Sequence, residues 1–409
     1  MASPGSFATG TWLNKVSTAI RSLDLSPFKR ITYTKTVVVA GFIAGFLLSR
    51  RLWASYRFYP LIPIFPGLPH IPTLLDGVLF AAMLVLLVLI GTAARPRTYI
   101  LSFAVLLLFL ALFDQTRWQP WAYLYLFMLL ALACFSWKAH DIPGQENALN
   151  ICRLIVCATY FYSGLQKMNP RFMVGTTSLF GALSSRWPVL HALGWIMAGA
   201  ETMIAIGLLT RKFRNVAVIA GVLMHLTILY TCAVLYHWNS VVWPWNVAMM
   251  AILFLLFWQT DFSFTRVVWV NPFRLQKVVL VLFAVLPFLS FFGWWDSYLS
   301  ASLYSANVPL AYVWMSPTAK QQLPLQIQWY VKKQPGGRDL LKIQDWALGE
   351  LNVPPYPAAR AYRTVGAELC RYSHNSPDIM LVVHEKDTLL QPGPSLPDTC
   401  LGTLLVNKW

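Results

Sequence analysis

Charged side chains are scarce in this sequence. Asp, Glu, Lys and Arg together make up 12% of its 409 residues, whereas a typical soluble domain carries about 25%. Hydrophobic residues make up 57%, and the mean hydropathy is +0.54. So few charges argue against an ordinary soluble fold, and they predict that much of the surface contacts hydrocarbon rather than water.

Metal-ligand spacings and a continuous basic face are also lacking. The six cysteines form no Cys-x-x-Cys motif, so no metal is predicted. The formal net charge is +16, but Lys and Arg gather in short clusters between apolar runs. Such clusters are typical of topology signals, and no nucleic-acid partner is expected. The first 30 residues are polar and basic and precede no cleavage motif, so no signal peptide is expected.

Long apolar runs dominate the first three quarters of the chain. Crossing a hydrocarbon core of roughly 30 Å takes about 20 helical residues. The candidate runs are 33–49, 74–94, 98–113, 121–137, 149–166, 191–210, 215–236, 241–258 and 275–293. The predicted fold is an all-α polytopic membrane helical bundle of about nine transmembrane helices (31–293), between an N-terminal tail (1–30) and a small C-terminal α+β domain (294–409).

Lys and Arg concentrate in alternate connections, and by the positive-inside rule these lie in the cytoplasm. When nine helices are threaded, the clusters on that side are Lys15/Arg21/Lys29/Arg30, Arg95/Arg97, Lys138, Arg211/Lys212/Arg214 and Arg266/Arg274/Lys277. Arg50, Arg51 and Arg57 violate the pattern. The balance predicts a multi-pass protein of a bacterial inner membrane, with a cytoplasmic N-terminus and a periplasmic C-terminus.

The C-terminal region reads as a small mixed domain. Residues 327–332, 379–385 and 401–406 alternate like strands, whereas 339–351 and 358–372 have helical spacing. Cys370 and Cys400 lie in this domain and are expected either to pair, if it faces an oxidising compartment, or to remain free thiols. The other four cysteines fall in predicted spans, where a small apolar role is expected.

Ionisable groups within spans are costly and are therefore functional candidates. Lys167 lies at the outer end of its span, where it acts either as an interfacial lysine or as an amine whose charge is suppressed by burial. Glu201 either pairs structurally, for example with Arg153, or serves a ligand or proton relay. His225 is either a hydrogen-bonded core residue or a site residue. The tryptophans at outer ends belong either to an interfacial belt or to the wall of a flat apolar ligand: Trp118, Trp121, Trp243 and Trp245.

Two motifs carry a family resemblance. Asp114-Gln-Thr-Arg-Trp118 with Tyr123-Leu-Tyr125, and Tyr160-Phe-Tyr-Ser-Gly-Leu-Gln-Lys-Met-Asn169, resemble the vitamin K-dependent γ-carboxylase transmembrane (HTTM) family. The segment 198–211 resembles the related DoxX-like membrane proteins, and the similarity covers roughly residues 75–270. The resemblance implies an outward-facing site in which Lys167 is the base that deprotonates vitamin K hydroquinone or another quinol. The ligand-binding residues expected around it are Asp114, Arg117, Trp118, Tyr123, Tyr160, Arg153, Glu201 and His225.

The predicted function is that of a quinol-linked membrane enzyme. Trp121 stands where the carboxylase has a histidine, so glutamate carboxylation itself is not expected. The alternative is a non-enzymatic DoxX-like membrane partner that supports a redox or maturation complex through its outer domain. A small-solute transporter is disfavoured, because the sequence has no paired broken helices or inverted halves.

Overall fold

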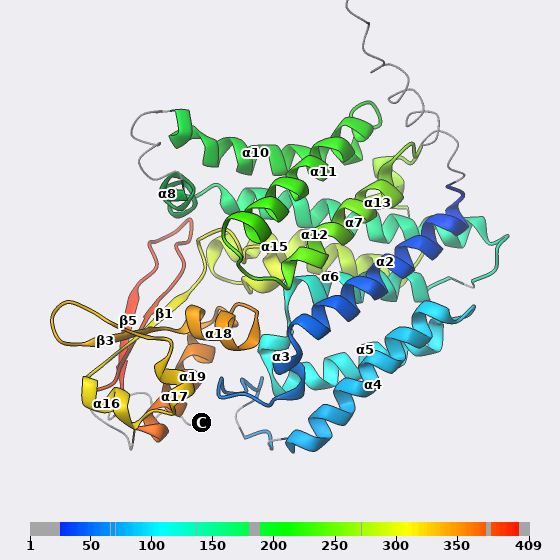
Figure 1. Ribbon diagram of the computed structural model, residues 1–409. Coiled ribbons are helices and arrows are strands. Elements are labelled where there is room, and N and C mark those ends of the chain that lie inside the picture. The colour runs from blue at the N-terminus through cyan, green and yellow to red at the C-terminus, as the bar shows by residue number, and fades with distance from the viewer. Residues whose placement is uncertain are drawn as a thin grey trace, which may run out of the picture.

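The computed structural model describes residues 25–65, 67–69, 71–135, 137–179, 189–270, 272–373 and 378–400. Most of them form a helical bundle, and a small sheet lies at one end of it (Figure 1). The main bundle helices are α2 (Pro27–Leu48), α4 (Thr73–Thr92), α5 (Arg97–Phe113), α6 (Pro120–Ala133), α7 (Ile142–Lys167), α10 (Val189–Leu209), α11 (Arg214–Tyr230), α12 (Val242–Phe257) and α14 (Arg274–Leu280). Shorter segments are α3 (Arg50–Ala54), η1 (Gln115–Arg117), α8 (Pro170–Leu179), η2 (Thr231–Leu235), α13 (Phe264–Val268), η3 (Val281–Val285), α15 (Leu286–Leu289), η4 (Ser290–Phe292) and η5 (Tyr298–Ser300).

Each of the nine apolar runs forms a helix, but the expectation of nine full spans is not confirmed. Within the residues that the structure describes, six helices are long and apolar enough to cross a membrane: Pro27–Leu48, Thr73–Thr92, Ile142–Lys167, Ala192–Leu209, Arg214–Leu235 and Arg274–Phe292. The helices α5, α6 and α12 have only 17, 14 and 16 residues. At 1.5 Å per residue they are about 26, 21 and 24 Å long, short of a core of roughly 30 Å. The run 121–137 overestimated α6 because the helix ends at Ala133, and Trp137 has a positive φ of 56°.

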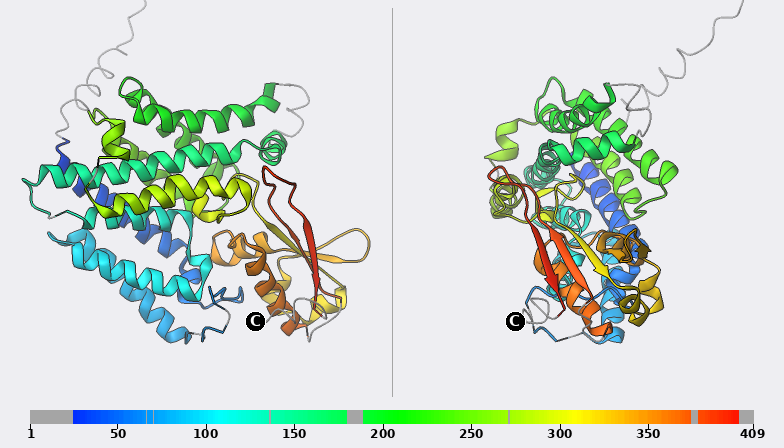
Figure 2. Two further views of the ribbon diagram at one scale, coloured as in Figure 1. Left: turned by 180° about the vertical axis from the view of Figure 1, so that it is seen from behind. Right: turned by 90° about the vertical axis from the view of Figure 1, so that its left-hand side faces the viewer.

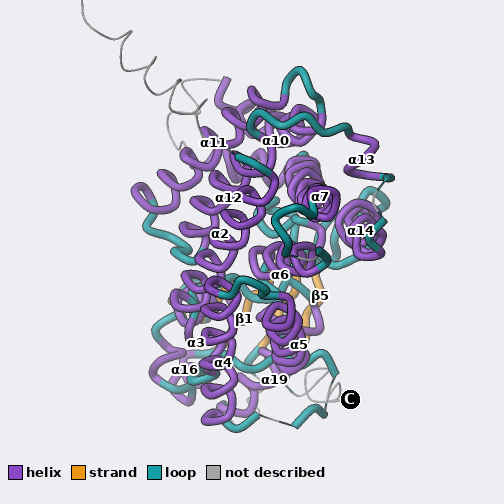
Figure 3. Tube along the Cα trace, turned by 90° about the vertical axis from the view of Figure 1, so that its right-hand side faces the viewer, coloured by secondary structure: helices purple, strands orange, loops and turns teal. Residues whose placement is uncertain are grey.

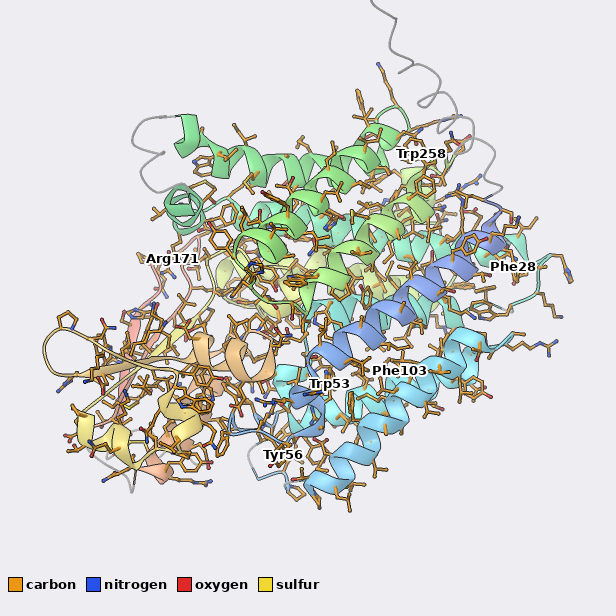
Figure 4. The ribbon with its side chains drawn as sticks, in the orientation of Figure 1. Phe28, Trp53, Tyr56, Phe103, Arg171 and Trp258 are labelled. Atoms are coloured by element: carbon orange, nitrogen blue, oxygen red, sulfur yellow. A yellow bond between two sulfur atoms is a disulfide. The ribbon has the colours of Figure 1, made fainter. Side chains whose placement is uncertain are left out.

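Successive bundle helices alternate in direction, so the bundle has two distinct ends. Asn352 of the C-terminal domain donates to the Leu48 carbonyl at the end of α2 (3.1 Å), which defines the domain end. At the opposite end, here the far end, Arg30 at the start of α2 donates to the Leu255 carbonyl of α12 (2.6 Å). Figure 4 places Phe28 and Trp258 at the far end and Arg171 at the domain end.

The C-terminal domain contains a five-stranded antiparallel sheet in the order β2-β3-β1-β4-β5. Its strands are β1 (Leu310–Met315), β2 (Val331–Lys333), β3 (Asp339–Lys342), β4 (Met380–His384) and β5 (Ser395–Thr399). The central strand β1 alternates buried and half-buried residues, and Val313 pairs with Leu341 on one side and Leu381 on the other. The domain helices are α16 (Pro317–Gln322), α17 (Leu325–Gln328), α18 (Ile343–Leu351) and α19 (Ala359–Tyr372).

Several elements of this domain differ from those expected. The helix expected at 339–351 divides into β3 and α18, because Asp339–Lys342 pairs with β2 on one side and with β1 on the other, and this strand pairing overrides a short local pattern. Of the strand expected at 327–332, only 331–333 is extended, and α17 covers 325–328. Helix α19 and strand β4 form where they were expected. The strand expected at 401–406 lies outside the described residues.

The domain is docked firmly on the bundle. The Glu350 carboxylate at the end of α18 accepts hydrogen bonds from the backbone N–H groups of Phe58 and Tyr59, in the connection after α3. Trp346 also donates to Glu350 (2.7 Å), which fixes the carboxylate in place. The loop between β4 and β5 extends along the bundle toward α8, where Arg171 pairs with Asp387 at 2.7 Å (Figure 2). Within the domain, Cys370 and Cys400 form a disulfide.

Candidate functional site

Lys167 and Glu201 form an ion pair at the domain end of the bundle. Lys167 is the last residue of α7, and its Nζ bonds to a carboxylate oxygen of Glu201 on α10 and to the Ser163 hydroxyl (2.9 Å). The two charged side chains are only 15% and 10% exposed. The Lys167 amine is therefore shielded from bulk water, and it has polar partners rather than apolar neighbours alone. It is held against a carboxylate between two helices.

A glycine allows these helices to approach. A Cβ at Gly164, one turn before the end of α7, would lie 2.6 Å from the Thr202 backbone nitrogen and 2.7 Å from the Ala198 carbonyl of α10. Contacts this short do not occur, so a larger residue would push α10 away from α7. The same close approach brings Glu201 within reach of Lys167.

A second polar chain crosses the bundle two turns deeper. The Tyr160 hydroxyl on α7 bonds to Nε2 of His225 on α11, and Nδ1 of His225 lies 2.7 Å from Oδ1 of Asn246 on α12. Asn246 in turn donates to the Val242 carbonyl (2.7 Å), so its amide oxygen faces the ring. The carbonyl oxygen of Asn246 accepts, which leaves the proton on Nδ1 and makes Nε2 the acceptor for the Tyr160 hydroxyl. His225 is thus part of a connected network.

An aromatic cavity of about 60 Å³ lies beside the ion pair. Its walls come from α6, α7, α12, η3 and the connection that follows α15, and Ser163 links it to Lys167. Tyr123 stacks on Phe283 in the wall, with ring centroids 4.7 Å apart. Among the described residues, neither the buried Tyr123 hydroxyl nor the Trp245 indole N–H has a hydrogen-bond partner. Both residues line the cavity, so its wall carries two buried donors that lack an acceptor.

Asp114 and Arg117 lie in a separate buried network. Asp114 pairs with Arg57, and Arg117 pairs with Asp76 at 2.7 Å. Ser55 joins the second pair by bonding to both of its partners. These contacts hold the connection after α3 against the start of α4 and against η1. Trp118 is placed differently, since its ring contacts Tyr123 edge-on with centroids 6.1 Å apart.

Arg153 is far from the other candidates. It lies 14 residues before Lys167 on the same helix, about 21 Å along the axis. Its Nη1 bonds to Glu146 (3.0 Å) and Asn150 (2.7 Å) at the far end. Glu201 therefore has a structural partner, as one of the two expectations held, but that partner is Lys167 and not Arg153.

Sequence reasoning missed several residues of this region. Ser163 is a common residue in helices and carries no distinctive pattern. Asn246 stands alone as an amide in an apolar helix, and Asp76 is an acid at the start of another, so both were signals that could have been used. The contribution of the connection after α15, which includes Tyr298 and Tyr304, depends on tertiary packing.

Comparisons with known proteins bear on this part of the bundle. Residues 145–242 match the family model of the methylamine utilisation protein MauE. The match covers most of α7 and continues through α8, α10 and α11, and includes Lys167, Glu201 and His225. It spans about a quarter of the chain, so it shows a similarity within this segment. No curated protein and no solved structure matches the chain.

This match corrects the resemblance drawn from the motifs. The chain matches neither the HTTM nor the DoxX family, and two of the segments that suggested them, 160–169 and 198–211, lie in the stretch that is similar to MauE. The motifs were not specific enough to identify a family, because Tyr, Gly, Lys and Asn near a helix end fit many membrane proteins. Asp114–Trp118, the other half of the resemblance, lies outside the matched segment and serves in buried ion pairs.

Proposed function

We propose that this chain is a multi-pass membrane component of a multi-protein system and that it binds a lipid-soluble quinone or quinol beside the Lys167–Glu201 pair. MauE is a membrane protein family of the methylamine utilisation system, and the similarity over 145–242 supports the first part. The second part rests on the aromatic cavity with its unpaired donors. Because α7, a helix of the matched segment, lines that cavity, both parts concern the same region.

The observation that carries ligand binding is the pair of unpartnered donors, the Tyr123 hydroxyl and the Trp245 indole N–H. A quinone offers carbonyl oxygens that accept hydrogen bonds and a flat ring that packs against aromatic walls. Ser163 connects the cavity to Lys167. In the proposed role Lys167 would accept a proton from a bound quinol, and the Glu201 carboxylate bonded to it would be its counter-ion.

The size of the cavity constrains this proposal. It holds about 60 Å³, whereas a benzene-sized ligand occupies a cavity on the order of 150 Å³. A ring therefore enters only if part of the wall moves. The connection around Tyr298–Ser300 is the natural candidate, since it is a short segment outside the long helices, followed by Ala301 with a positive φ of 56°.

The test is mass spectrometry of lipid-soluble molecules that co-purify with the detergent-extracted protein. Tyr123→Phe removes one unpaired donor but keeps the ring, and we expect it to retain roughly fivefold less quinone, the equivalent of one hydrogen bond. Tyr125→Phe is the matched control, because the Tyr125 hydroxyl is also buried and unpaired but does not line the cavity. A protein that carries no quinone when taken from quinone-rich membranes contradicts the proposal.

The second candidate function is that of a non-enzymatic membrane partner. The firmly docked C-terminal domain favours it, because a rigid outer domain presents a fixed surface to another protein. A stoichiometric protein partner together with an empty bundle would support this function over quinone binding. Both candidate functions imply the same orientation of the protein in the membrane. We propose this orientation from the distribution of Lys and Arg and from the Cys370–Cys400 disulfide, since disulfides persist in oxidising compartments.

The N-terminus is proposed to be cytoplasmic and the C-terminal domain periplasmic. Of the three arginines that violate the positive-inside rule at the domain end, Arg57 is held in a buried pair with Asp114, whereas Arg50 and Arg51 are exposed. The far end carries most of the remaining bundle charge: Lys29, Arg30, Arg95, Arg97, Lys138, Arg211, Lys212, Arg214, Arg266, Arg274 and Lys277. Alkaline phosphatase fused after the last residue should be active. Activity only from a fusion at the N-terminus would reverse the orientation.

A further inference from the structure

A second cavity lies at the far end of the bundle. Its volume is about 650 Å³, and it is lined by the start of α2, the start of α7, the loop after α12 and part of α13. Figure 3 looks at this end of the bundle, where α2, α7, α12 and α13 surround the region. The described lining includes Arg30, Arg153 and Arg266. None of the residues discussed above at the domain end contributes to it.

Two buried arginines near this cavity are accounted for by helix capping. Arg30 donates to the Leu255 and Trp258 carbonyls at the end of α12 (2.6 and 3.0 Å). Arg214 donates to the Leu208 carbonyl at the end of α10 (2.9 Å) and to the loop after α12. Cations that bond the last carbonyls of a helix are stabilising, so neither guanidinium requires a further ligand.

Arg153 is different. Its side chain is 1% exposed, and its Nε and Nη1 atoms bond to the Leu256 carbonyl, Glu146 and Asn150. Within the described part of the chain, its Nη2 atom makes no hydrogen bond. The Phe262 ring, 4.3 Å from the Arg153 guanidinium, holds the group in the cavity wall. A buried guanidinium with free donors beside a cavity is an incomplete binding group.

Positive charge is in excess around this position. Arg30 and Arg153 line the cavity, and Arg266 reaches it from the exposed helix α13. Among the described residues that line it, the carboxylates are Glu146, which already pairs with Arg153, and Asp261, which pairs with Arg211 at 2.9 Å. Positive charges that lie close together in surroundings of low polarity repel each other and cost free energy. An anion bound between them offsets that cost.

We propose that the far-end cavity binds a phosphate group through Arg153 and Arg266. The planar guanidinium fork matches phosphate oxygens in geometry and charge. The side chains of Ile142 and Val270 line the same cavity and are exposed, so its rim is apolar. A phospholipid headgroup and a free phosphate share this chemistry, and the apolar rim favours the lipid. The site is independent of quinone binding at the domain end.

The experiment follows thermal unfolding of the full chain in a neutral detergent by tryptophan fluorescence. The probes are dioctanoyl phosphatidate, inorganic phosphate and dioctanoylglycerol, which lacks phosphate. A ligand that binds only the folded state raises the unfolding temperature with its concentration. We expect a saturable rise with phosphatidate and none with dioctanoylglycerol. Arg266→Gln should need roughly tenfold more phosphatidate for the same shift, the loss of about one charged hydrogen bond.

Two further variants sharpen the test. Arg274→Gln removes the same charge from an exposed position at the same end and should leave the response unchanged, because Arg274 does not line the cavity. Arg153→Lys keeps the charge but loses the fork, and it should weaken the response at least as much as Arg266→Gln. Because Arg266 is exposed, its variant tests the site even if Arg153→Lys fails to fold.

The outcomes separate the two phosphate sources. A response to phosphatidate alone assigns the cavity to a lipid headgroup, and a response to inorganic phosphate, with or without the lipid, assigns it to phosphate itself. Equal responses to phosphatidate and dioctanoylglycerol overturn the proposal. So does an equal loss in Arg266→Gln and Arg274→Gln, or the absence of any shift.

Discussion

Replacing Glu201 by Gln tests the role of the ion pair between α7 and α10 most directly. The substitution preserves size and polarity but removes the charge opposite Lys167. In the native structure both side chains are nearly enclosed, at 15% and 10% exposure, and the Ser163 hydroxyl is the other partner of Nζ. The variant leaves an ammonium group in this enclosure with neutral partners.

The expected loss of stability follows from that enclosure. Removing one partner of a fully buried ion pair costs about 3–5 kcal/mol. Residual exposure lowers this figure, so we expect Glu201→Gln to destabilise the protein by about 2–3 kcal/mol. The double variant Lys167→Met with Glu201→Gln removes both members. It should therefore be less destabilised than the sum of the single variants, with a coupling of roughly 1–2 kcal/mol.

The assay is unfolding of the purified protein in detergent, for the two single variants and the double variant. An exposed pair in the C-terminal domain supplies the control: Lys332 and Asp345 are 63% and 37% exposed and lie 2.9 Å apart. Breaking it with Asp345→Asn should cost below about 0.5 kcal/mol. If Glu201→Gln lost no more stability than Asp345→Asn, the pair would be solvated, and its assignment to the site would be refuted.

Three other substitutions test neighbouring features. Gly164→Ala should cost about 1–3 kcal/mol in detergent unfolding, because its Cβ would meet the α10 backbone, whereas Gly199→Ala, with open space around it, should be neutral or stabilising. Asp114→Asn should cost about 3–5 kcal/mol in the same assay, because it leaves the buried Arg57 side chain without its carboxylate partner. Replacing Cys370 and Cys400 by Ser should cost about 3–4 kcal/mol for a loop of 30 residues, and reductant should then have no further effect on unfolding.

The sequence was sufficient to predict the bundle helices and the ionisable residues within them that are candidates for function. Long apolar runs specify helices in lipid because every backbone group must be bonded within the segment. For the same reason, a charged residue in such a run had to find a partner or a cavity, which is why Lys167, Glu201 and His225 were identifiable. Helix ends were less predictable, since α6 stops four residues before its apolar run does.

The partners themselves were not predictable from these patterns. Glu201 meets Lys167 because Gly164 permits two helices to touch, and His225 meets Tyr160 and Asn246 because three helices converge. Such convergence depends on packing angles that no local pattern encodes. The same limitation explains the domain, where β1 was missed because its partners, β3 and β4, lie up to about 70 residues away along the chain.

The length of α7 connects the two proposed sites. This helix has 26 residues, about 39 Å at 1.5 Å per residue, and therefore exceeds a core of roughly 30 Å. Its first three turns line the far-end cavity, and its last two turns line the aromatic cavity or carry Lys167 at the domain end. Because α7 is one continuous helix and most of its residues are buried, its position determines the position of both sites. Because a Cβ at Gly164 would push α10 away from α7, we expect Gly164→Ala to leave the phosphate response at the far end unchanged, and a weakened response would show that the whole of α7 shifts. An unchanged phosphate response with a broken Lys167–Glu201 pair would show that α10 moves instead.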